Sequence, residues 1–187
     1  MPETDEEVDA MRMKRVEKND PVAMLQMGNV RHDEGDYKSA FEYFTKAAEL
    51  GDAVAHYNLS VMYHLGQGVE KDEKKKGYHL EKAAIGGHVS ARHHLGYHEA
   101  NNGRLERAVK HWIIAANMGL DESLKVLGEL NAMGLVKKVA LTVTRHTHQD
   151  AVDAPKSPQR EQAEEFRKEK LKKPRENKAT RFMSRRS

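Results

Sequence analysis

The sequence of 187 residues contains no cysteine, and this absence excludes more chemistry than any other feature. Disulfide bonds, thiolate zinc sites, iron–sulfur clusters and cysteine nucleophiles all need a side chain that the chain does not have. Aromatic residues are also scarce, at 6% with a single tryptophan. Because 33% of the residues are charged and the mean hydropathy is −0.84, the apolar residues must be well patterned to form a core, and a deep spherical core is not expected.

Signals for membranes and for export are absent as well. The first nine residues carry five acidic side chains, where a secretory signal needs a basic stretch followed by an apolar one. No apolar run approaches the roughly 18 residues of a membrane span. We therefore expect a soluble intracellular protein, cytoplasmic or nuclear.

Charge is distributed unevenly along the chain. The whole sequence has a net charge of +3, yet residues 155–187 contain 12 Lys and Arg against 5 Asp and Glu, which leaves −4 for the remainder. This shift in composition divides the chain into three parts. We expect an acidic N-terminal helix or extension over residues 1–19, a body over residues 20–154 and a basic charged tail over residues 155–187.

The body repeats a short pattern in which an Ala-Ala pair is followed three residues later by glycine, at intervals of 36 and 32 residues. The residues of this pattern are Ala47, Ala48, Gly51, Ala83, Ala84, Gly87, Ala115, Ala116 and Gly119. A second pattern at the same intervals includes Ala55, Leu59, Leu95 and Gly96. The longer interval is explained by an inserted Gly-Gln-Gly-Val at residues 66–69, which contains Gly66 and Gly68. Repeat units are thus expected near residues 20–51, 52–87 and 88–119, with a partial fourth over 120–154.

Each unit is predicted to form two helices, because Ala, Leu and aromatic residues recur at i, i+3, i+4 and i+7. Gly51, Gly87 and Gly119 stand where helix ends favour a left-handed residue, so the chain should turn about every 16 residues. Small residues in the first helices, such as Gly96, should face bulky ones in the second helices, such as Trp112. The β-branched run in residues 137–148 predicts a poor fourth second helix, and residues 158–173 predict a charged helix.

These residues resemble a known family, the Sel-1-like repeats, which are a variant of tetratricopeptide-like helical hairpins. The second unit matches the family pattern most closely, at Ala55, Leu59, Tyr63, Gly66, Gly68, Val69, Asp72, Lys82, Ala83, Ala84, Gly87 and His88. The first and third units lack the insert. The resemblance implies an all-α, right-handed α-solenoid of helix-turn-helix repeats, and it implies a scaffold that binds other proteins. The basic C-terminal helix lacks an apolar stripe, so we expect it to be disordered or frayed.

The approach to the repeats, residues 12–21, is similar to a group of such proteins in which a cysteine-rich zinc module comes first. That module is missing here, so no ubiquitin-ligase role is inferred from it. A third reading is that the chain is a remnant of a longer zinc-module protein without independent activity.

Motifs for catalysis and for metal binding are weak. His94 and His98 stand four residues apart on one helical face, but zinc needs three or four ligands, and the other histidines are scattered across registers. Neither a nucleophile-elbow motif nor a phosphate-loop motif occurs. The sequence therefore predicts no enzyme, no cofactor and no metal site.

Stacked hairpins would leave one face of the first helices free of packing, and this face is the candidate binding surface. The predicted groove consists of Asn29, His32, Tyr57, Val61, His64, His93, Tyr97 and Asn101. Tyr and His beside aliphatic residues are typical of protein interfaces, so we predict a non-enzymatic adaptor that binds a protein or peptide there. The alternative is that these residues only cover a tightly curved array.

The basic tail supports a rival function. Residues 172–175, Lys-Lys-Pro-Arg, fit a nuclear-import pattern, although such strings are also common in solvated tails. Few aromatic residues lie among the charges, so any contact with nucleic acid or an anionic surface would depend on phosphate attraction without base readout.

Overall fold

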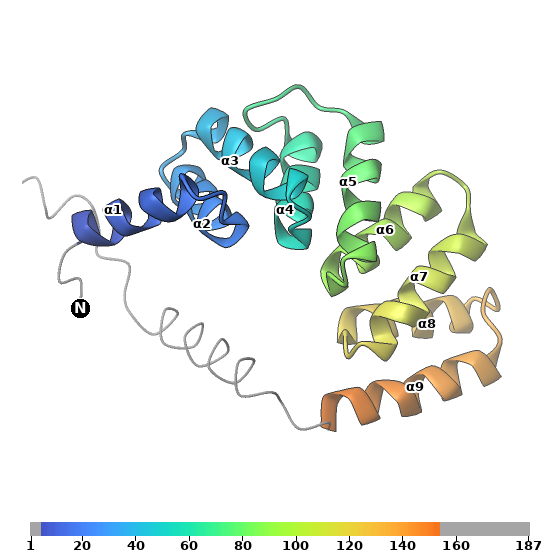
Figure 1. The fold of residues 1–187 in the computed structure, drawn as a ribbon. Coiled ribbons are helices and arrows are strands. Elements are labelled where there is room, and N and C mark those ends of the chain that lie inside the picture. The colour runs from blue at the N-terminus through green and yellow to red at the C-terminus, as the bar shows by residue number, and fades with distance from the viewer. Residues whose placement is uncertain (1–4, 154–187) are drawn as a thin grey trace, which may run out of the picture. The chain divides into compact units, whose positions relative to one another are not determined.

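The computed structural model describes the backbone of residues 5–153 and the side chains of residues 7–137 and 144–152. Over this part the chain is all-helical (Figure 1). The helices are α1 Asp5–Val16, α2 Pro21–Asp33, α3 Tyr37–Glu49, α4 Ala53–Leu65, α5 Glu73–Ile85, α6 Val89–Asn101, α7 Leu105–Asn117, α8 Asp121–Ala132 and α9 Lys138–Asp153. None of these helices is long and apolar enough to cross a membrane. The predicted helix at 158–173 lies outside the described residues.

Helix starts follow the predicted spacing. Helices begin at residues 21, 37 and 53, and again at 73, 89, 105 and 121, so each starts 16 residues after the previous one except across the insert. Across the insert the step from α4 to α5 is 20 residues, because four residues are inserted there. Neighbouring helices along the chain pack against each other from α1 to α8. The regular step thus produces stacked antiparallel hairpins, α2–α3, α4–α5 and α6–α7.

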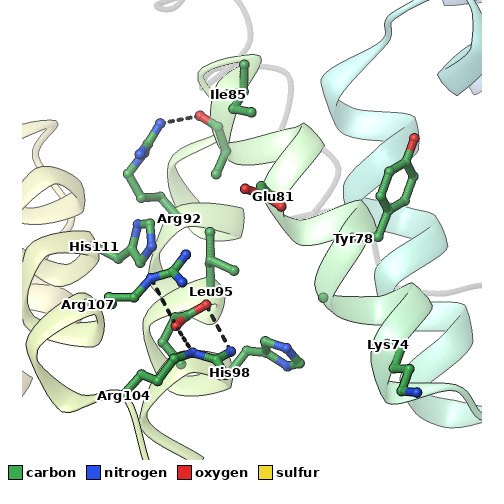
Figure 2. A pocket seen from close by; sticks show the side chains of 13 residues that line it. Lys74, Tyr78, Glu81, Ile85, Arg92, Leu95, His98, Arg104, Arg107 and His111 are labelled. Carbon is green, nitrogen blue, oxygen red and sulfur yellow. Dashed lines mark hydrogen bonds and ion pairs between the residues drawn. The ribbon is translucent and has the colours of Figure 1, made fainter. Parts of the chain in front are cut away.

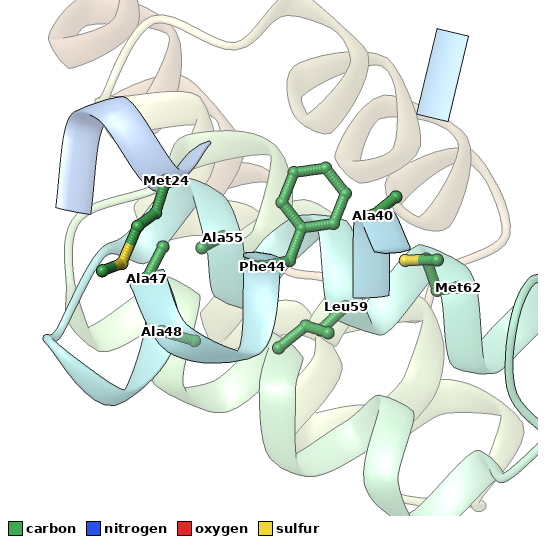
Figure 3. Packing of buried hydrophobic residues seen from close by; sticks show 8 residues of the cluster. All are labelled: Met24, Ala40, Phe44, Ala47, Ala48, Ala55, Leu59 and Met62. Atoms are coloured by element: carbon green, nitrogen blue, oxygen red, sulfur yellow. The ribbon is translucent and has the colours of Figure 1, made fainter. Parts of the chain in front are cut away.

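The core lies in the seams between these helices. In the first seam Phe44 of α3 is only 2% exposed and packs with Met24, Ala40, Ala47, Ala48, Ala55, Leu59 and Met62 (Figure 3). A methyl group added at Gly28 of α2 would lie 2.5 Å from the Phe44 ring. Gly28 therefore lets the ring approach the α2 backbone, as the recurrence of small residues predicted. The same arrangement recurs in the third hairpin, where Gly96 of α6 faces Trp112 of α7.

Turns between the helices use the residues that the pattern indicated. Gly51, Gly87 and Gly119 all have positive φ, between 85° and 88°, which only glycine adopts without strain. The Asp52 side chain caps α4 by accepting from Ala55 N, at 2.7 Å. His88 caps α6 in the same way, because its ring nitrogen accepts from Ala91 N at 3.1 Å.

The inserted loop contacts the preceding hairpin at Gln67, whose Oε1 atom lies 3.3 Å from His32 Nε2 of α2, and at Gly68. Gly68 has φ +70°, and a methyl group built on it would lie 2.4 Å from the carbonyl oxygen of Tyr37, at the start of α3. Gly68 is therefore needed both for its backbone conformation and for close approach. The loop acts as a spacer that rests on the first hairpin while α5 starts four residues late.

The last helix, α9, continues for 16 residues despite its β-branched composition. Thr144 and His148 lie one turn apart and are both buried, at 2% and 6% exposure. The His148 ring nitrogen lies 2.9 Å from an Asp121 carboxylate oxygen at the start of α8. Tertiary contacts of this kind override a weak intrinsic helix preference. Residues 154–187 lie outside the described residues.

Candidate protein-binding groove

A cavity of about 490 Å³ opens between α4, α5 and α6. It is lined by Tyr57, Ser60, Val61, His64, Lys76, Leu80, His94, Tyr97, His98 and Asn101. A smaller cavity of about 240 Å³ continues toward α2 and is lined by Asn29, His32, Phe44, Tyr57, Asn58, Val61 and Met62. Tyr57 and Val61 line both cavities, so the two form one surface across three repeats. We call this surface the first-helix groove.

Seven of the eight predicted groove residues line these two cavities: Asn29, His32, Tyr57, Val61, His64, Tyr97 and Asn101. The eighth, His93, does not. It is 9% exposed, and its Nδ1 atom lies 2.7 Å from the Ser123 hydroxyl oxygen on α8. The equivalent position one repeat earlier is Tyr57, which packs on the next hairpin at His88. This register position therefore points toward the following repeat, and His93 is used for packing.

Ring contacts hold both groove tyrosines in place. Tyr57 stacks on His88 with ring centroids 4.4 Å apart and on His94 at 5.8 Å. Tyr97 meets Trp112 edge-on at 5.2 Å while 43% of its surface stays exposed. Because neighbouring rings already restrict these side chains, a partner would order them at little further cost in entropy.

At one end the groove carries a small charged cluster. Glu73 at the start of α5 lies 3.0 Å from Lys76 Nζ and 3.2 Å from His64 Nδ1. Burial by itself raises the pKa of Glu73, but the hydrogen bonds from Lys76 and His64 outweigh it and leave the pKa below its ordinary value. Lys76 Nζ also lies 3.2 Å from His64 Nδ1.

This cluster has the donor types of a metal site but not the arrangement. Among the residues that the structure describes, no group of three His, Asp or Glu side chains could hold a metal ion. The Lys76 ammonium lies within 3.2 Å of both His64 and Glu73, and its positive charge disfavours a metal ion beside them. Burial and the nearby Lys76 lower the pKa of both His94 and His98, the pair with zinc-like spacing.

Sequence reasoning missed the groove residues that come from the second helices. Lys76 and Leu80 belong to α5, and a search confined to the first-helix register could not include them. His94 was considered only as half of a histidine pair with zinc-like spacing, yet it lies beside Tyr57. A signal for the burial of His93 did exist, since Ser123 replaces the alanine found at the equivalent position of earlier repeats. A buried hydroxyl needs a hydrogen-bond partner, which His93 provides.

Stacked two-helix units with an open groove along their first helices define a helical-hairpin repeat protein. The family model described as the Sel1 repeat matches residues 21–52, 53–88 and 90–120, together more than half of the chain. The chain therefore belongs to the Sel1 repeat family, as its resemblance to Sel-1-like repeats predicted.

Solved structures agree on the fold. A Sel1 repeat protein from Oxalobacter formigenes superposes with a TM-score of 0.65 at 27% identity, covering 78% of this chain and 64% of that one. The antigen c5321 of uropathogenic Escherichia coli, described as an SLR fold, superposes with a TM-score of 0.61 at 21% identity, covering 95% of this chain and 38% of that one.

Among curated proteins, the chain is similar to HcpC of Helicobacter pylori, which has been named a beta-lactamase. In strain J99 the two are 39% identical over 56 residues, and in strain 26695 they are 40% identical over 52 residues. These stretches cover 30% and 28% of this chain. The chain spans 19% and 18% of the length of these two relatives.

Proposed function

We propose that the chain is a non-enzymatic adaptor that binds a protein or peptide segment in the first-helix groove. Members of the Sel1 repeat family typically mediate protein–protein interactions. The single observation that carries the proposal is the pair of aromatic anchors, Tyr57 and Tyr97, which line one cavity from successive repeats. Aromatic residues of this kind supply much of the binding energy at protein interfaces.

Away from the charged cluster at its end, the groove's chemistry favours a partner segment without strong charge. Asn29, Asn58 and Asn101 present amide groups, and Val61 presents apolar surface. Asn58 Nδ2 donates to Asn29 Oδ1 at 3.3 Å, so two adjacent first helices are joined across the groove floor. Such a lining suits an extended peptide, whose backbone amides bind the asparagines while its apolar side chains fill the cavities.

Alanine variants of the two tyrosines test the proposal. A partner is first captured with the full-length protein, and its affinity is then measured by calorimetry for wild type, Tyr57→Ala and Tyr97→Ala. We expect each variant to lose about 1 to 3 kcal/mol of binding free energy. Tyr43→Ala is the matched control, because Tyr43 lies on α3 outside the groove. If both groove variants fold and bind the partner with unchanged affinity, the binding site lies outside the groove.

Beta-lactam hydrolysis, suggested by the name of the Helicobacter relative, is tested directly. No serine in this sequence has a lysine three residues later, so the Ser-x-x-Lys pair that serine beta-lactamases use is missing. The chain also has no cysteine, and its described part holds no cluster of metal ligands. We expect no hydrolysis of a chromogenic cephalosporin above the buffer rate. A rate that rises with protein concentration would contradict the adaptor proposal.

A second candidate function rests on the basic tail, whose net charge of +7 follows from 12 basic and 5 acidic residues. We propose binding of nucleic acid or an anionic surface there, in the cytoplasm or nucleus. Affinity for a DNA duplex should then fall steeply with salt, because each neutralised phosphate releases counterions. Groove binding should be far less sensitive to salt.

A further inference from the structure

A third cavity lies between α5, α6 and α7 and has a volume of about 500 Å³ (Figure 2). We call it the α5–α7 cavity. Its charged lining, apart from histidines, consists of Lys74, Arg92, Arg104, Arg107, Glu81 and Glu99. Four cationic side chains therefore face two carboxylates. This surplus of positive charge distinguishes the cavity from the first-helix groove.

One of the two carboxylates, that of Glu99, is already paired with arginine side chains. The Glu99 side chain is 5% exposed and pairs with both Arg104 and Arg107, the latter at 3.3 Å. The hydrogen bond from Arg104 is the main reason that the pKa of Glu99 lies below its ordinary value, so Glu99 stays ionised. Two guanidinium groups thus share one carboxylate and together keep a positive charge at the cavity wall.

Arg92 has no carboxylate partner among the described residues, and the same holds for the exposed Lys74. Arg92 donates to the carbonyl oxygen of Ala84 in the last turn of α5, and no carboxylate of the described residues lies within ion-pair distance of it. Its Nε atom is buried without a hydrogen-bond partner, and so is Nδ1 of His111, which lines the same cavity. A guanidinium held this way keeps free N–H donors for an external carboxylate, the group whose geometry it matches best.

The rim of the cavity is apolar and exposed. Ile85 at the end of α5 is 72% exposed and Tyr78 is 53% exposed. A bare phosphate or other small anion would fill little of the cavity and would leave this rim uncovered. A peptide that carries carboxylates next to apolar side chains would use both the cationic wall and the rim.

We propose that the α5–α7 cavity binds an acidic segment of a partner protein, with one carboxylate paired to Arg92 and an apolar side chain packed on Ile85 and Tyr78. The cavity adjoins the first-helix groove at His98, which lines both, but all its other lining residues differ from those of the groove. A methyl group at Gly77 would lie 2.5 Å from His98 Nε2, so this ring packs directly on the α5 backbone.

The experiment uses the full chain and a fluorescent, terminally blocked peptide of alternating Glu and Leu, with the Gln-Leu peptide of equal length as its neutral counterpart. Dissociation constants are measured by anisotropy for wild type, Arg92→Gln and Lys74→Gln. Lys125→Gln on α8 is the matched control, since it removes the same charge from an exposed position outside the cavity. Every variant retains the basic tail, so binding to the tail would respond equally in all of them.

We expect the acidic peptide to bind wild type at least about tenfold more tightly than Arg92→Gln, and the Lys125→Gln control to match wild type. If Arg92→Gln does not fold, the double variant Lys74→Gln/Arg107→Gln replaces it, because both side chains are exposed.

Three results would overturn the proposal: equal binding of the acidic and neutral peptides, equal loss in Lys125→Gln, or full displacement of the peptide by an equimolar amount of inorganic phosphate. The groove variant Tyr97→Ala should leave the affinity unchanged. A failure of this proposal is therefore distinguishable from a failure of the adaptor function.

Discussion

Replacing two helix-interior glycines by alanine should change stability in opposite directions, although both stand at the same register of their repeats. Alanine is the better helix former by about 1 kcal/mol, so either substitution would be stabilising if nothing stood in the way. At Gly128 of α8 no described atom lies within 4 Å of the added methyl group. At Gly96 of α6 the methyl group would lie 2.5 Å from Nε1 of Trp112 and 2.8 Å from two further ring atoms.

The Trp112 ring cannot move away cheaply. It is 3% exposed and packs with Ala108, Ala116 and Leu127. Overpacking of a filled core typically costs about 1 to 3 kcal/mol. Because the added methyl group would lie so close to a rigid ring, we expect an overpacking cost of about 2 to 3 kcal/mol. The better helix preference of alanine offsets about 1 kcal/mol of this cost. Gly96→Ala should therefore destabilise the protein by about 1 to 2 kcal/mol, whereas Gly128→Ala should stabilise it by up to about 1 kcal/mol.

Urea unfolding monitored by circular dichroism and by fluorescence gives the two values. The protein has a single tryptophan, so its emission reports on the α6–α7 seam itself. A change in the unfolding midpoint at unchanged slope measures stability alone. Equal shifts of the same sign in both variants would refute the reasoning, because the seam contact would then have no energetic weight.

Three further predictions concern the protonation of one buried histidine and the packing of two small residues. Burial is the main cause that lowers the pKa of His79 to about 4, and the charge of His56 is the second. Between about pH 6.5 and 4 the unfolded chain therefore binds a proton at His79 that the folded protein does not bind, so the free energy of unfolding, full above pH 6.5, should fall across this window by at most about 3 kcal/mol. Unfolding midpoints at pH 7 and pH 4.5 measure this fall, which should be smaller in His79→Leu. Gly68→Ala should cost about 1 to 3 kcal/mol in chemical unfolding, because of its positive φ and the Tyr37 carbonyl oxygen; a neutral result would show that the loop detaches at no cost. Ala83→Asp, which places a charge at a site with 0% exposure, should abolish the cooperative thermal transition, whereas an unchanged melt would mean that the seam tolerates water.

The histidines illustrate how context changes a residue's role. The chain has 11 of them, and within the described residues no three His, Asp or Glu side chains form a group that could hold a metal ion. In the described part, burial is the largest cause lowering the pKa of His56, His79, His88, His93, His94, His98 and His111. Neutral imidazole rings here cap a helix, stack on tyrosines and bond to one another. His56 and His79, for example, approach to 3.0 Å between Nδ1 atoms.

The repeat architecture could be predicted from the sequence because its determinants are local. Helix period, the left-handed glycines after each Ala-Ala pair and the capping residues such as Asp52 act within a few residues of the chain. The insert at residues 66–69 was recognised by its spacing for the same reason. Stacking then follows, since an apolar stripe on each hairpin has nowhere to be buried except against its neighbours.

Side-chain direction at the seams was decided only by the tertiary structure. His93 and Tyr97 stand four residues apart on one helical face, yet one is buried on Ser123 and the other is 43% exposed. His93 reaches Ser123 on α8, whereas Tyr97 meets only the edge of Trp112 on α7 and stays partly exposed. These contacts depend on how the hairpins stack, which no local pattern encodes. Likewise, the cationic wall of the α5–α7 cavity joins residues of three helices, among them Lys74, Arg92 and Arg107. Local interactions determine the helices and turns, whereas burial and charge pairing across helices depend on contacts that form only when the hairpins stack.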